Sequence, residues 1–595
     1  MNVLGIIACD VGGHPSACIL KDGQLVAFVE EERFVRVKQA LGYFPSHSIR
    51  FCLDRAGLTL ADVDAIAFGW DANAYRWRFP LFLAGSFLSQ QLQPARVRAR
   101  SVPQGRPSLG AGVLAGMRSL LSFQPRVLTE SIVLGLRDAG YLEGRIPPIV
   151  FVKHHLAHAA SAFYCSGFEE SAVLVFDGHG EENTTTIFRG EGKRLTLLKE
   201  INIPHSLGWF YSAFTEFLGW SPNEGEVKLM GLAPFGTPNA EIETLVAEVL
   251  ELTDDGFRVN ADYLFYGRRS YGKFFSDALV ERLGSPRGAR DPLTDRHRDI
   301  ARAVQSRLEA AGIHLAKLAL RLAGSQNLCL AGGVALNCKM NGEIHKQGVA
   351  QRLFVQPIAY DGGVSLGAAQ VVAMDQGDDC RFVLDHLYWG PEYSDPEIEA
   401  VLKLNRLVYR RSEEPAEEAA RLIAEGRIVG WFQGRMECGP RALGGRSILA
   451  DPRNPEMKDR VNDRVKFREA WRPFALSIQE EHFAEYAKKP APSPFMIMAF
   501  EVADGMHDGI QSAMHWVDHT TRPQTVSRQT NPRYWDLLEA FRRRTGVPGV
   551  LNTSFNVKDE PIVCTPRDAV RCFFGSGMDA LVIGSYVIEK AGPAS

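Results

Sequence analysis

The run HHLAH at residues 154–158 places three histidines within five positions. If the run is helical, His154 and His158 lie one turn apart on one face, where both imidazoles can bind one metal ion. An apolar stretch then ends in FDGHG (176–180), where a strand end would project the carboxylate of Asp177. Two neutral imidazoles and a carboxylate suit Fe²⁺, Mn²⁺ or Zn²⁺. The spacing predicts a metal site; a helix whose histidines make ordinary hydrogen bonds is the alternative.

Two glycine-rich turns follow later apolar strands. In AGGVALN (331–337), Gly332 and Gly333 would present backbone amides to a phosphate. In YDGG (360–363), Asp361 could supply a fourth metal ligand or contact Mg²⁺. Each turn taken alone also fits a purely structural role.

The second half of the chain carries arginines in glycine-rich or polar segments. These segments are GRMECGPRALGGRS (434–447), KFREAWRPF (466–474), HTTRPQ (519–524) and LNTSFN (551–556). Guanidinium groups in rigid loops, with amide and hydroxyl donors nearby, favour bidentate phosphate recognition. The chain has 67 Lys and Arg against 70 Asp and Glu, so we expect a local anion site within a near-neutral surface. A cluster of surface salt bridges is the alternative.

Composition excludes several classes of protein. A formal charge of −3 argues against a nucleic-acid partner, whose binding depends on phosphate neutralisation. No apolar run reaches the roughly 18 residues needed to span a bilayer, and MNVLGIIACD lacks a basic leader. The 10 cysteines form no CxxC pair, which favours reduced thiols over disulfides or structural zinc. We expect a cytoplasmic protein that acts on small molecules, without a membrane or nucleic-acid partner.

Alternating strand and helix patterns predict two α/β domains. At 595 residues the chain is too long for one core. A polar stretch without periodicity at 374–381 is the predicted linker, which gives domains at 1–374 and 385–595. An Arg-, Pro- and Gly-rich insertion at about 80–125 is either a solvated loop or a lid over a substrate pocket. The main predicted elements are strands 3–9, 18–20, 25–29, 172–176, 328–331 and 428–432, and helices 300–322, 395–404 and 414–425.

Together these motifs resemble the carbamoyltransferase family of nodulation-factor, cephamycin and tobramycin biosynthesis. The resemblance covers almost the whole chain and implies an N-terminal ASKHA-type domain and a C-terminal YrdC-like domain. Besides the motifs above, it depends on HPSA (14–17), EERFVRVK (31–38), DGHGE (177–181), GEVKLMGLAP (225–234) and GPRALG (439–444).

The resemblance implies a carbamoyltransferase with two half-reactions. The C-terminal domain would convert carbamoyl phosphate and Mg²⁺-bound ATP to carbamoyl adenylate. An acceptor hydroxyl would then attack the carbamoyl carbon in the N-terminal domain, in secondary metabolism such as antibiotic biosynthesis. Carried over by motif, the metal ligands are His154, His158, Asp177 and Asp361, with Fe²⁺ expected, and the catalytic residues beside the carbamoyl group are His14 and Lys38. The nucleotide and carbamoyl-phosphate residues are Lys466, Arg472, Arg522, Asn552, Ser554, Arg441, Gly332, Gly333, Asn337 and Lys228.

Three other functions compete with this interpretation. A threonylcarbamoyl-type tRNA-modification enzyme has similar halves, but the near-neutral charge disfavours tRNA. Hydrogenase-maturation carbamoyl transfer would call for zinc-finger CxxC pairs, which this sequence lacks. An ASKHA-type small-molecule kinase would leave the arginines of the second half unexplained. The acceptor could be an aminoglycoside, a macrolide or ansamycin, an alkaloid or a lipo-oligosaccharide, and a homodimer is left open.

Overall fold

A computed structural model describes residues 1–8, 13–73, 124–141, 144–264 and 274–590. The insertion expected at 80–125 lies outside the described residues except for its last two positions. The chain forms two compact units: Met1–Val26 with Gly42–Val383, and Ala27–Leu41 with Leu384–Ser595. Residues 27–41 therefore group with the second unit, whereas the sequence analysis placed all of 1–374 in the first domain.

The first unit contains the same five-stranded sheet topology twice. The first sheet has the order β3-β2-β1-β4-β5, with β1 antiparallel to β2 and parallel to β4. The second has the order β8-β7-β6-β11-β12, with β6 antiparallel to β7 and parallel to β11. The mixed sheets and their helices confirm the expected α/β class, and the repeated strand order is the arrangement expected of an ASKHA-type domain. The strands are β1 (Asn2–Ile7), β2 (Ser16–Lys21), β3 (Gln24–Glu30), β4 (Ala65–Phe68), β5 (Ile149–Phe151), β6 (Glu170–Gly180), β7 (Asn183–Glu191), β8 (Arg194–Asn202), β11 (Asn327–Ala331) and β12 (Arg352–Val355).

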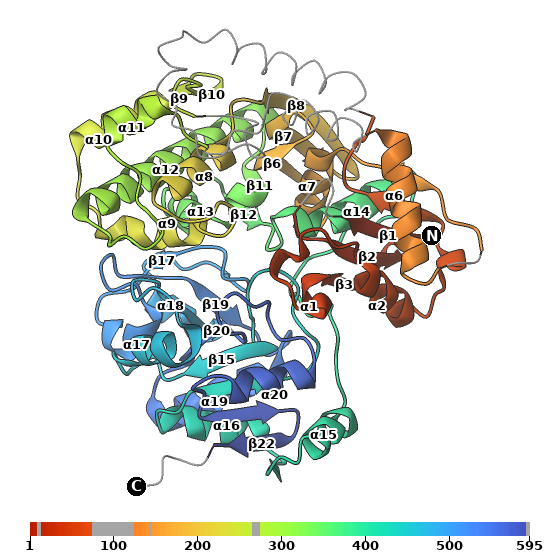
Figure 1. The fold of residues 1–595 in the computed structure, drawn as a ribbon, viewed down its shortest axis with the longest axis vertical. Coiled ribbons are helices and arrows are strands. Elements are labelled where there is room, and N and C mark those ends of the chain that lie inside the picture. Colours follow the sequence, from red (N-terminus) through yellow and green to blue (C-terminus); the bar gives the residue numbers. More distant parts are fainter. Residues whose placement is uncertain (9–12, 74–123, 142–143, 265–273, 591–595) are drawn as a thin grey trace. The chain divides into compact units, whose positions relative to one another are not determined.

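Two helices pack between the two sheets of this unit. Helix α14 (Val364–Asp375) packs on β1, β2 and β4, and helix α7 (His154–Phe163) packs on β6 and β11 (Figure 1). The two helices also pack against each other. Their approach is close at Gly367, where an added Cβ would lie 1.7 Å from the carbonyl oxygen of Ala157, so a larger residue would push the helices apart.

The remaining elements of the first unit surround these layers. The longest is α12 (Asp295–Ala323), which extends beyond the predicted helix 300–322 and packs on α10, α13 and β6. Within the described part of the chain, no helix is long and apolar enough to cross a membrane. The other elements are α2 (Ser46–Ala56), η2 (Leu60–Asp62), α6 (Pro125–Asp138), α8 (Leu207–Phe217), α9 (Glu226–Leu232), η4 (Ala233–Phe235), α10 (Ala240–Val249), β9 (Leu250–Thr253), β10 (Gly256–Val259), α11 (Asp277–Leu283), η5 (Gly333–Leu336), α13 (Cys338–Lys346) and η6 (Asp361–Gly363).

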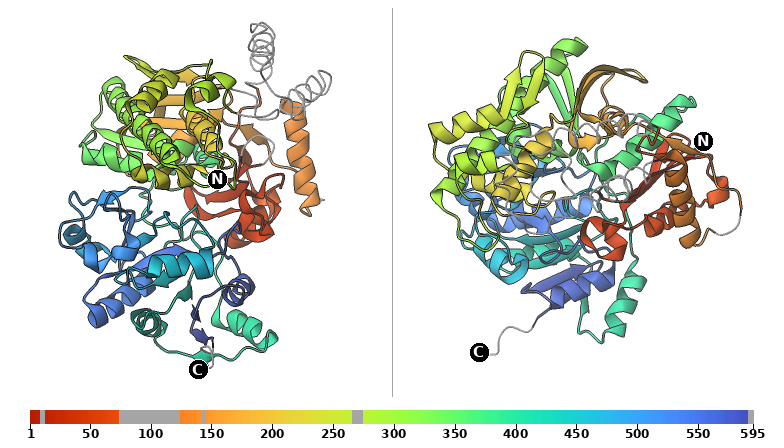
Figure 2. Two further views of the ribbon diagram at one scale, coloured as in Figure 1. Left: turned by 60° about the vertical axis from the view of Figure 1, so that its left-hand side comes forward. Right: turned by 45° about the horizontal axis from the view of Figure 1, so that its top comes forward.

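The second unit is built on one eight-stranded mixed sheet of order β13-β22-β21-β14-β15-β20-β16-β19. Every residue of β14, β15 and β16 is buried, so both faces of the sheet are covered, because successive side chains point to opposite faces. Helices α16 (Pro415–Ala424) and α19 (Pro532–Thr545) pack against each other and on this sheet (Figures 1 and 2). The strands are β13 (Arg410–Arg411), β14 (Val429–Phe432), β15 (Arg446–Ala450), β16 (Ala475–Gln479), β19 (Pro523–Val526), β20 (Gly549–Ser554), β21 (Ala580–Ile583) and β22 (Tyr586–Glu589), with β17 (Phe500–Glu501) and β18 (Thr520–Thr521) as a separate pair.

Short helices complete the second unit, two of them in residues 27–41. Those two are α1 (Glu32–Val35) and η1 (Lys38–Ala40). The others are α15 (Asp395–Leu404), α16 (Pro415–Ala424), α17 (Met457–Val461), η7 (Asn462–Lys466), η8 (Glu480–His482), α18 (Phe483–Tyr486), η9 (His507–Gly509), η10 (Gln511–Ala513), α19 (Pro532–Thr545) and α20 (Pro566–Phe574).

Candidate metal centre and cation cluster

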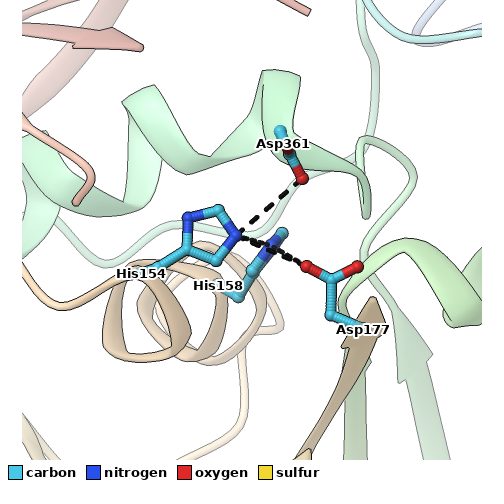
Figure 3. Close-up of side chains that lie close together, drawn as sticks. All are labelled: His154, His158, Asp177 and Asp361. Carbon is cyan, nitrogen blue, oxygen red and sulfur yellow. Dashed lines mark hydrogen bonds and ion pairs between the residues drawn. The ribbon is translucent and has the colours of Figure 1, made fainter. Parts of the chain in front are cut away.

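The first unit brings together all four residues that the sequence analysis proposed as metal ligands. His154 and His158 come from α7, Asp177 from the end of β6, and Asp361 from η6 immediately before α14 (Figure 3). One ligand atom from each of the four lies within 4.8 Å of all the others. Residues from three separate elements therefore converge on one point.

Three of the ligand atoms are in closest contact. The Nε2 atoms of His154 and His158 are 3.1 Å apart. The Oδ2 atom of Asp177 lies 3.4 Å from the first of these nitrogens and 3.5 Å from the second. Asp361 Oδ1 is 3.8 Å from His154 Nε2. Both histidine side chains are fully buried, so water does not solvate this cluster from the helix side.

Backbone groups orient three of the four ligands. The Nδ1 atom of His154 lies 3.1 Å from the carbonyl oxygen of Gly69. A carbonyl can only accept, so Nδ1 carries a proton, and Nε2 faces the cluster as the atom that a metal would bind in place of a proton. The amide of Gly333 donates to Asp177 Oδ1 at 3.0 Å, and that of Gly13 donates to Asp361 Oδ2 at 2.8 Å. Each carboxylate thus has one oxygen fixed by the backbone and one directed at the cluster.

Electrostatics within the cluster favour positive charge. Burial opposes protonation of His154, but the carboxylates of Asp177, Asp361 and Glu181 outweigh it and raise its pKa to about 9. Burial lowers the pKa of His158. Burial would raise the pKa of Asp177, yet its hydrogen bonds with the two histidines hold it well below its usual range. An anionic group beside facing imidazole nitrogens fits a divalent cation with nitrogen and oxygen ligands.

Glu181 is a residue of this site that the sequence analysis quoted in DGHGE without assigning it a role. Its Oε1 accepts from the amide of His154 at 3.0 Å and from that of Asp71 at 2.7 Å. It thus holds the first turn of α7, where the helix presents its positive end. Burial raises the pKa of Glu181 to about 7. In the sequence, its position as the acidic residue that ends DGHGE was the feature that could have identified it.

In the structure, the AGGVALN turn and its asparagine form hydrogen bonds within the protein. The amide of Gly333 donates to Asp177, and Gly332 has φ +86°, where an added Cβ would lie against the carbonyl oxygen of Phe176. Asn337 caps α13 by accepting from the amide of Met340, and its side chain exchanges two hydrogen bonds with Gln305. These contacts tie the turn to the ligand Asp177 and to the start of α13.

Two other predicted residues lie elsewhere in the first unit. His14 has φ +66° and packs edge-on against Tyr360, with ring centroids 4.5 Å apart. His14 therefore flanks the metal-ligand group. Its neighbour Gly13 donates to Asp361, and its ring partner Tyr360 directly precedes Asp361 in the chain. Lys228 is half-buried in α9.

The second unit gathers five cationic side chains from three sequence motifs: the GPRALG loop, KFREAWRPF and HTTRPQ. They are Arg441, Lys466, Arg468, Arg472 and Arg522. Burial lowers the pKa of Arg468 well below its usual range, and the charges of Arg472, Arg522 and Arg441 lower it further. Burial also lowers the pKa of Arg472, which Glu469 partly offsets from 3.6 Å. Like charges crowded in this way are stabilised by an anion.

Lys466 is the most enclosed member of the cluster, with 6% of its surface exposed. Its Nζ donates to Ser554 Oγ at 3.2 Å and to Asn556 Oδ1 at 2.7 Å, at the end of β20. Burial lowers its pKa well below the usual range, and the charges of Arg468, Arg472 and Lys38 lower it further. The acceptors of Lys466 Nζ are hydroxyl and amide oxygens, so they carry no negative charge that would offset the burial of this amine.

Three further observations describe the geometry of the cluster. Arg468 was absent from the predicted site residues, although it stands in the KFREAWRPF motif; its Nε donates to Asn462 Oδ1 at 2.9 Å. The Nε of Arg522 is buried without a hydrogen-bond partner among the described residues. Asn552 donates to the carbonyl of Ala442 at 3.1 Å and so ties β20 to the loop that carries Arg441.

Lys38, one of the two predicted catalytic residues, belongs to the second unit, and its role beside the carbamoyl group stays a prediction. The resemblance placed it beside the acceptor in the N-terminal domain, but the residues that contain it pack with the second unit. Its charge acts on Lys466, as noted above. The reason is that the chain enters the second unit at residue 27, within β3, and returns to the first unit at residue 42.

Comparison with known proteins matches both units to one family. Residues 4–370 match the family described as carbamoyltransferase N-terminus, and residues 420–590 match the carbamoyltransferase C-terminus. The chain is 38% identical to the nodulation protein NolNO of Sinorhizobium fredii, over 97% of this chain and 79% of that protein. It is 41% identical to the nodulation protein NolO of Bradyrhizobium diazoefficiens, over 75% of this chain and 80% of that protein. An uncharacterized protein of Synechocystis, sll1178, is 39% identical over 99% of this chain and 97% of its own length.

Proposed function

Because this chain belongs to the carbamoyltransferase family, we propose that it carbamoylates a hydroxyl group of a sugar or natural product through carbamoyl adenylate. The observation that carries the proposal is the chemical difference between its two sites. The second unit has a cluster of cations suited to phosphates, and the first has a His and Asp group suited to a divalent metal. The two half-reactions are assigned to these sites in that order.

In the first half-reaction, carbamoyl phosphate, ATP and water would yield carbamoyl adenylate, diphosphate and phosphate. Both substrates are polyanions, and the planar guanidinium of Arg472 or Arg522 can bind two phosphate oxygens at once. Lys466 supplies a point charge beside the Ser554 hydroxyl. Arg441 adds a further positive charge from the loop between β14 and β15. Bringing the phosphates together in this way offsets their mutual repulsion and holds them for reaction.

In the second half-reaction, the acceptor oxygen would bond to the carbamoyl carbon while the bond from that carbon to the AMP phosphate oxygen breaks. The proton of the acceptor hydroxyl must leave at the same time. His14 flanks the metal-ligand group and is the proposed base, because an imidazole can accept a proton near neutral pH. A divalent metal held by the four ligands would neutralise charge on the departing phosphate. The metal proposed is Fe²⁺, with Mn²⁺ and Zn²⁺ as alternatives.

One assay separates this function from that of an ASKHA-type kinase. The purified full chain is given ATP, with and without carbamoyl phosphate, and AMP and diphosphate are measured. The proposal requires diphosphate formation that depends on carbamoyl phosphate, and AMP formation once an acceptor is added. Transfer of the γ-phosphate to an acceptor, with ADP as product, would instead establish the kinase. With candidate acceptors present, mass spectrometry should show replacement of a hydroxyl hydrogen by CONH₂.

A further inference from the structure

Residues 27–41 hold a peptide of the second unit from both sides. Glu30 Oε1 accepts a hydrogen bond from the amide of Gly439 at 2.6 Å. Arg33 Nη2 donates to the carbonyl oxygen of the same glycine, also at 2.6 Å. Gly439 has φ +86°, a left-handed conformation that favours glycine, and Pro440 and Arg441 follow it directly. The clamp formed by Glu30 and Arg33 therefore fixes the chain direction just before a cation of the cluster.

The clamp is buried and its two charges are paired. Glu30 is 1% exposed and Arg33 is 2% exposed. Arg33 Nε lies 3.6 Å from Glu30 Oε2, and its Nη1 lies 3.0 Å from Glu32 Oε1. Two charges removed from water need this mutual pairing, and removal of one leaves the other uncompensated. Loss of Arg33 would therefore disturb both the carboxylate of Glu30 and the turn that the two residues hold.

The rest of the segment anchors the clamp to the same unit. Arg36 donates to the carbonyl oxygens of Ile562 at 2.5 Å and Pro561 at 2.8 Å. Phe34 packs against an apolar group that includes Met436 and Ala442, on either side of the clamped turn. The segment thus spans two loops that flank the cation cluster, and the electrostatic influence of Lys38 reaches Lys466 from its far end.

We propose that Glu30 and Arg33 are positioning residues for anion binding in the second unit, which act by fixing Arg441 through Gly439. The proposal rests on the proposed function, because that function makes the cluster around Arg441 and Arg472 an anion site. It assigns a role in phosphate handling to a segment that the sequence places within the first domain.

The test measures the affinity of the full chain for inorganic diphosphate by isothermal titration calorimetry. Arg33→Met should weaken binding at least about tenfold, which corresponds to ~1.4 kcal/mol. Arg33→Lys should recover part of this loss, because it keeps the charge but not the planar fork. The matched control is Arg421→Met, the same change at a partly exposed arginine of α16 that pairs with Glu418 and Glu425, and it should bind as the wild type does.

A double-mutant cycle distinguishes positioning from general stabilisation. If Arg33 acts through Arg441, Arg33→Met should have little further effect in an Arg441→Met background. Equal losses in both backgrounds, or wild-type affinity of a folded Arg33→Met variant, would overturn the proposal. If Arg33→Met does not fold, Glu30→Gln takes its place in the cycle, because it preserves the shape of the acceptor. Arg472→Met is the separate check on the function: normal diphosphate binding by that variant would reject the anion site itself.

Discussion

His154 and His158 present their Nε2 atoms to each other at 3.1 Å inside a fully buried part of the first unit. The Gly69 carbonyl holds a proton of His154 on Nδ1, so Nε2 is the ring atom that points at the second ring. Two facing lone pairs repel unless a proton or a cation lies between them. With Asp177 and Asp361 within reach of both, the arrangement suits a cation that binds all four groups.

We therefore expect the purified protein to contain a divalent metal, measurable by elemental analysis. His158→Ala should lose this metal, because three remaining ligands include only one imidazole. It should also lose acceptor carbamoylation. Formation of carbamoyl adenylate should continue, since the cation cluster belongs to the other unit.

The matched control for this variant is His155→Gln, on the same buried helix. The His155 ring bonds to Thr186 Oγ1 at 3.0 Å and is not one of the four ligands. This variant should keep the metal. A fully active wild-type preparation without metal would reject the metal centre.

Gly333→Ala should loosen the metal while leaving the fold intact. An added Cβ would lie 2.9 Å from Asp177 Oδ1, so this carboxylate must shift from the amide that orients it. We expect a metal affinity reduced about 10- to 100-fold, which is typical when a group that orients a ligand is disturbed. Gly13→Ala is the control, since its Cβ would lie 3.9 Å from Asp361 Oδ2, an ordinary contact.

Competition titration with a metal-sensitive chelator measures both glycine variants. If Gly333→Ala instead weakens ATP binding and retains its metal, this turn would have the phosphate-binding role that its sequence suggested. Equal metal affinity in the two variants would show that the Gly333 amide does not orient the ligand.

The elements of the fold could largely be predicted from the sequence because they depend on local pattern. Strand β6 follows from its apolar run, and the four-residue spacing of His154 and His158 fits the helix α7 that the structure contains. Asp361 was recognised because it follows a strand in a glycine turn. The α/β class and the carbamoyltransferase family are both confirmed.

The remaining features depend on contacts that leave no local pattern. The amide of Gly333 could serve a phosphate or a carboxylate equally well, and only the folded position of Asp177 decides between them. Likewise, nothing in EERFVRVK itself separates this segment from the first domain, which surrounds it in the sequence. Its assignment to the second unit depends on Gly439, 409 residues after Glu30 in the chain, which contacts both Glu30 and Arg33.

Arg472→Ala or Arg522→Ala should reduce carbamoyl adenylate formation at least tenfold. Removing one partner of a desolvated, charge-assisted contact commonly costs about 2–5 kcal/mol, and each ~1.36 kcal/mol is tenfold in rate. Replacement by Lys should rescue activity only partly. Diphosphate release dependent on carbamoyl phosphate measures the effect, with Arg410→Ala as the control at an exposed ion pair.

Added carbamoyl adenylate should restore acceptor carbamoylation in both arginine variants. His14→Ala should behave in the opposite way and accumulate adenylate that no acceptor consumes. If added adenylate rescues neither arginine variant while circular dichroism shows a folded protein, the division into two sites is wrong and both steps share one site.

Phosphate binding should take up a proton at Lys466. Burial and the neighbouring cations lower the pKa of this ammonium group, so Lys466 is neutral between that lowered pKa and its ordinary value of 10.5. A bound phosphate favours the ammonium form and raises the pKa again. Within this pH window, binding therefore adds a proton; below the lowered pKa, Lys466 is already charged and uptake disappears.

Calorimetry in buffers of different ionisation enthalpy counts the protons taken up. The titrations are made above about pH 8, where the second phosphate proton (pKa near 6 for phosphoryl groups) is already lost. Lys466→Arg is the matched control, because a guanidinium stays charged and should bind phosphate without uptake. Lys466→Met should bind weakly and also without uptake. Equal proton uptake by the wild type and Lys466→Arg would place the titrating group elsewhere and exclude Lys466 as the residue that couples phosphate binding to pH.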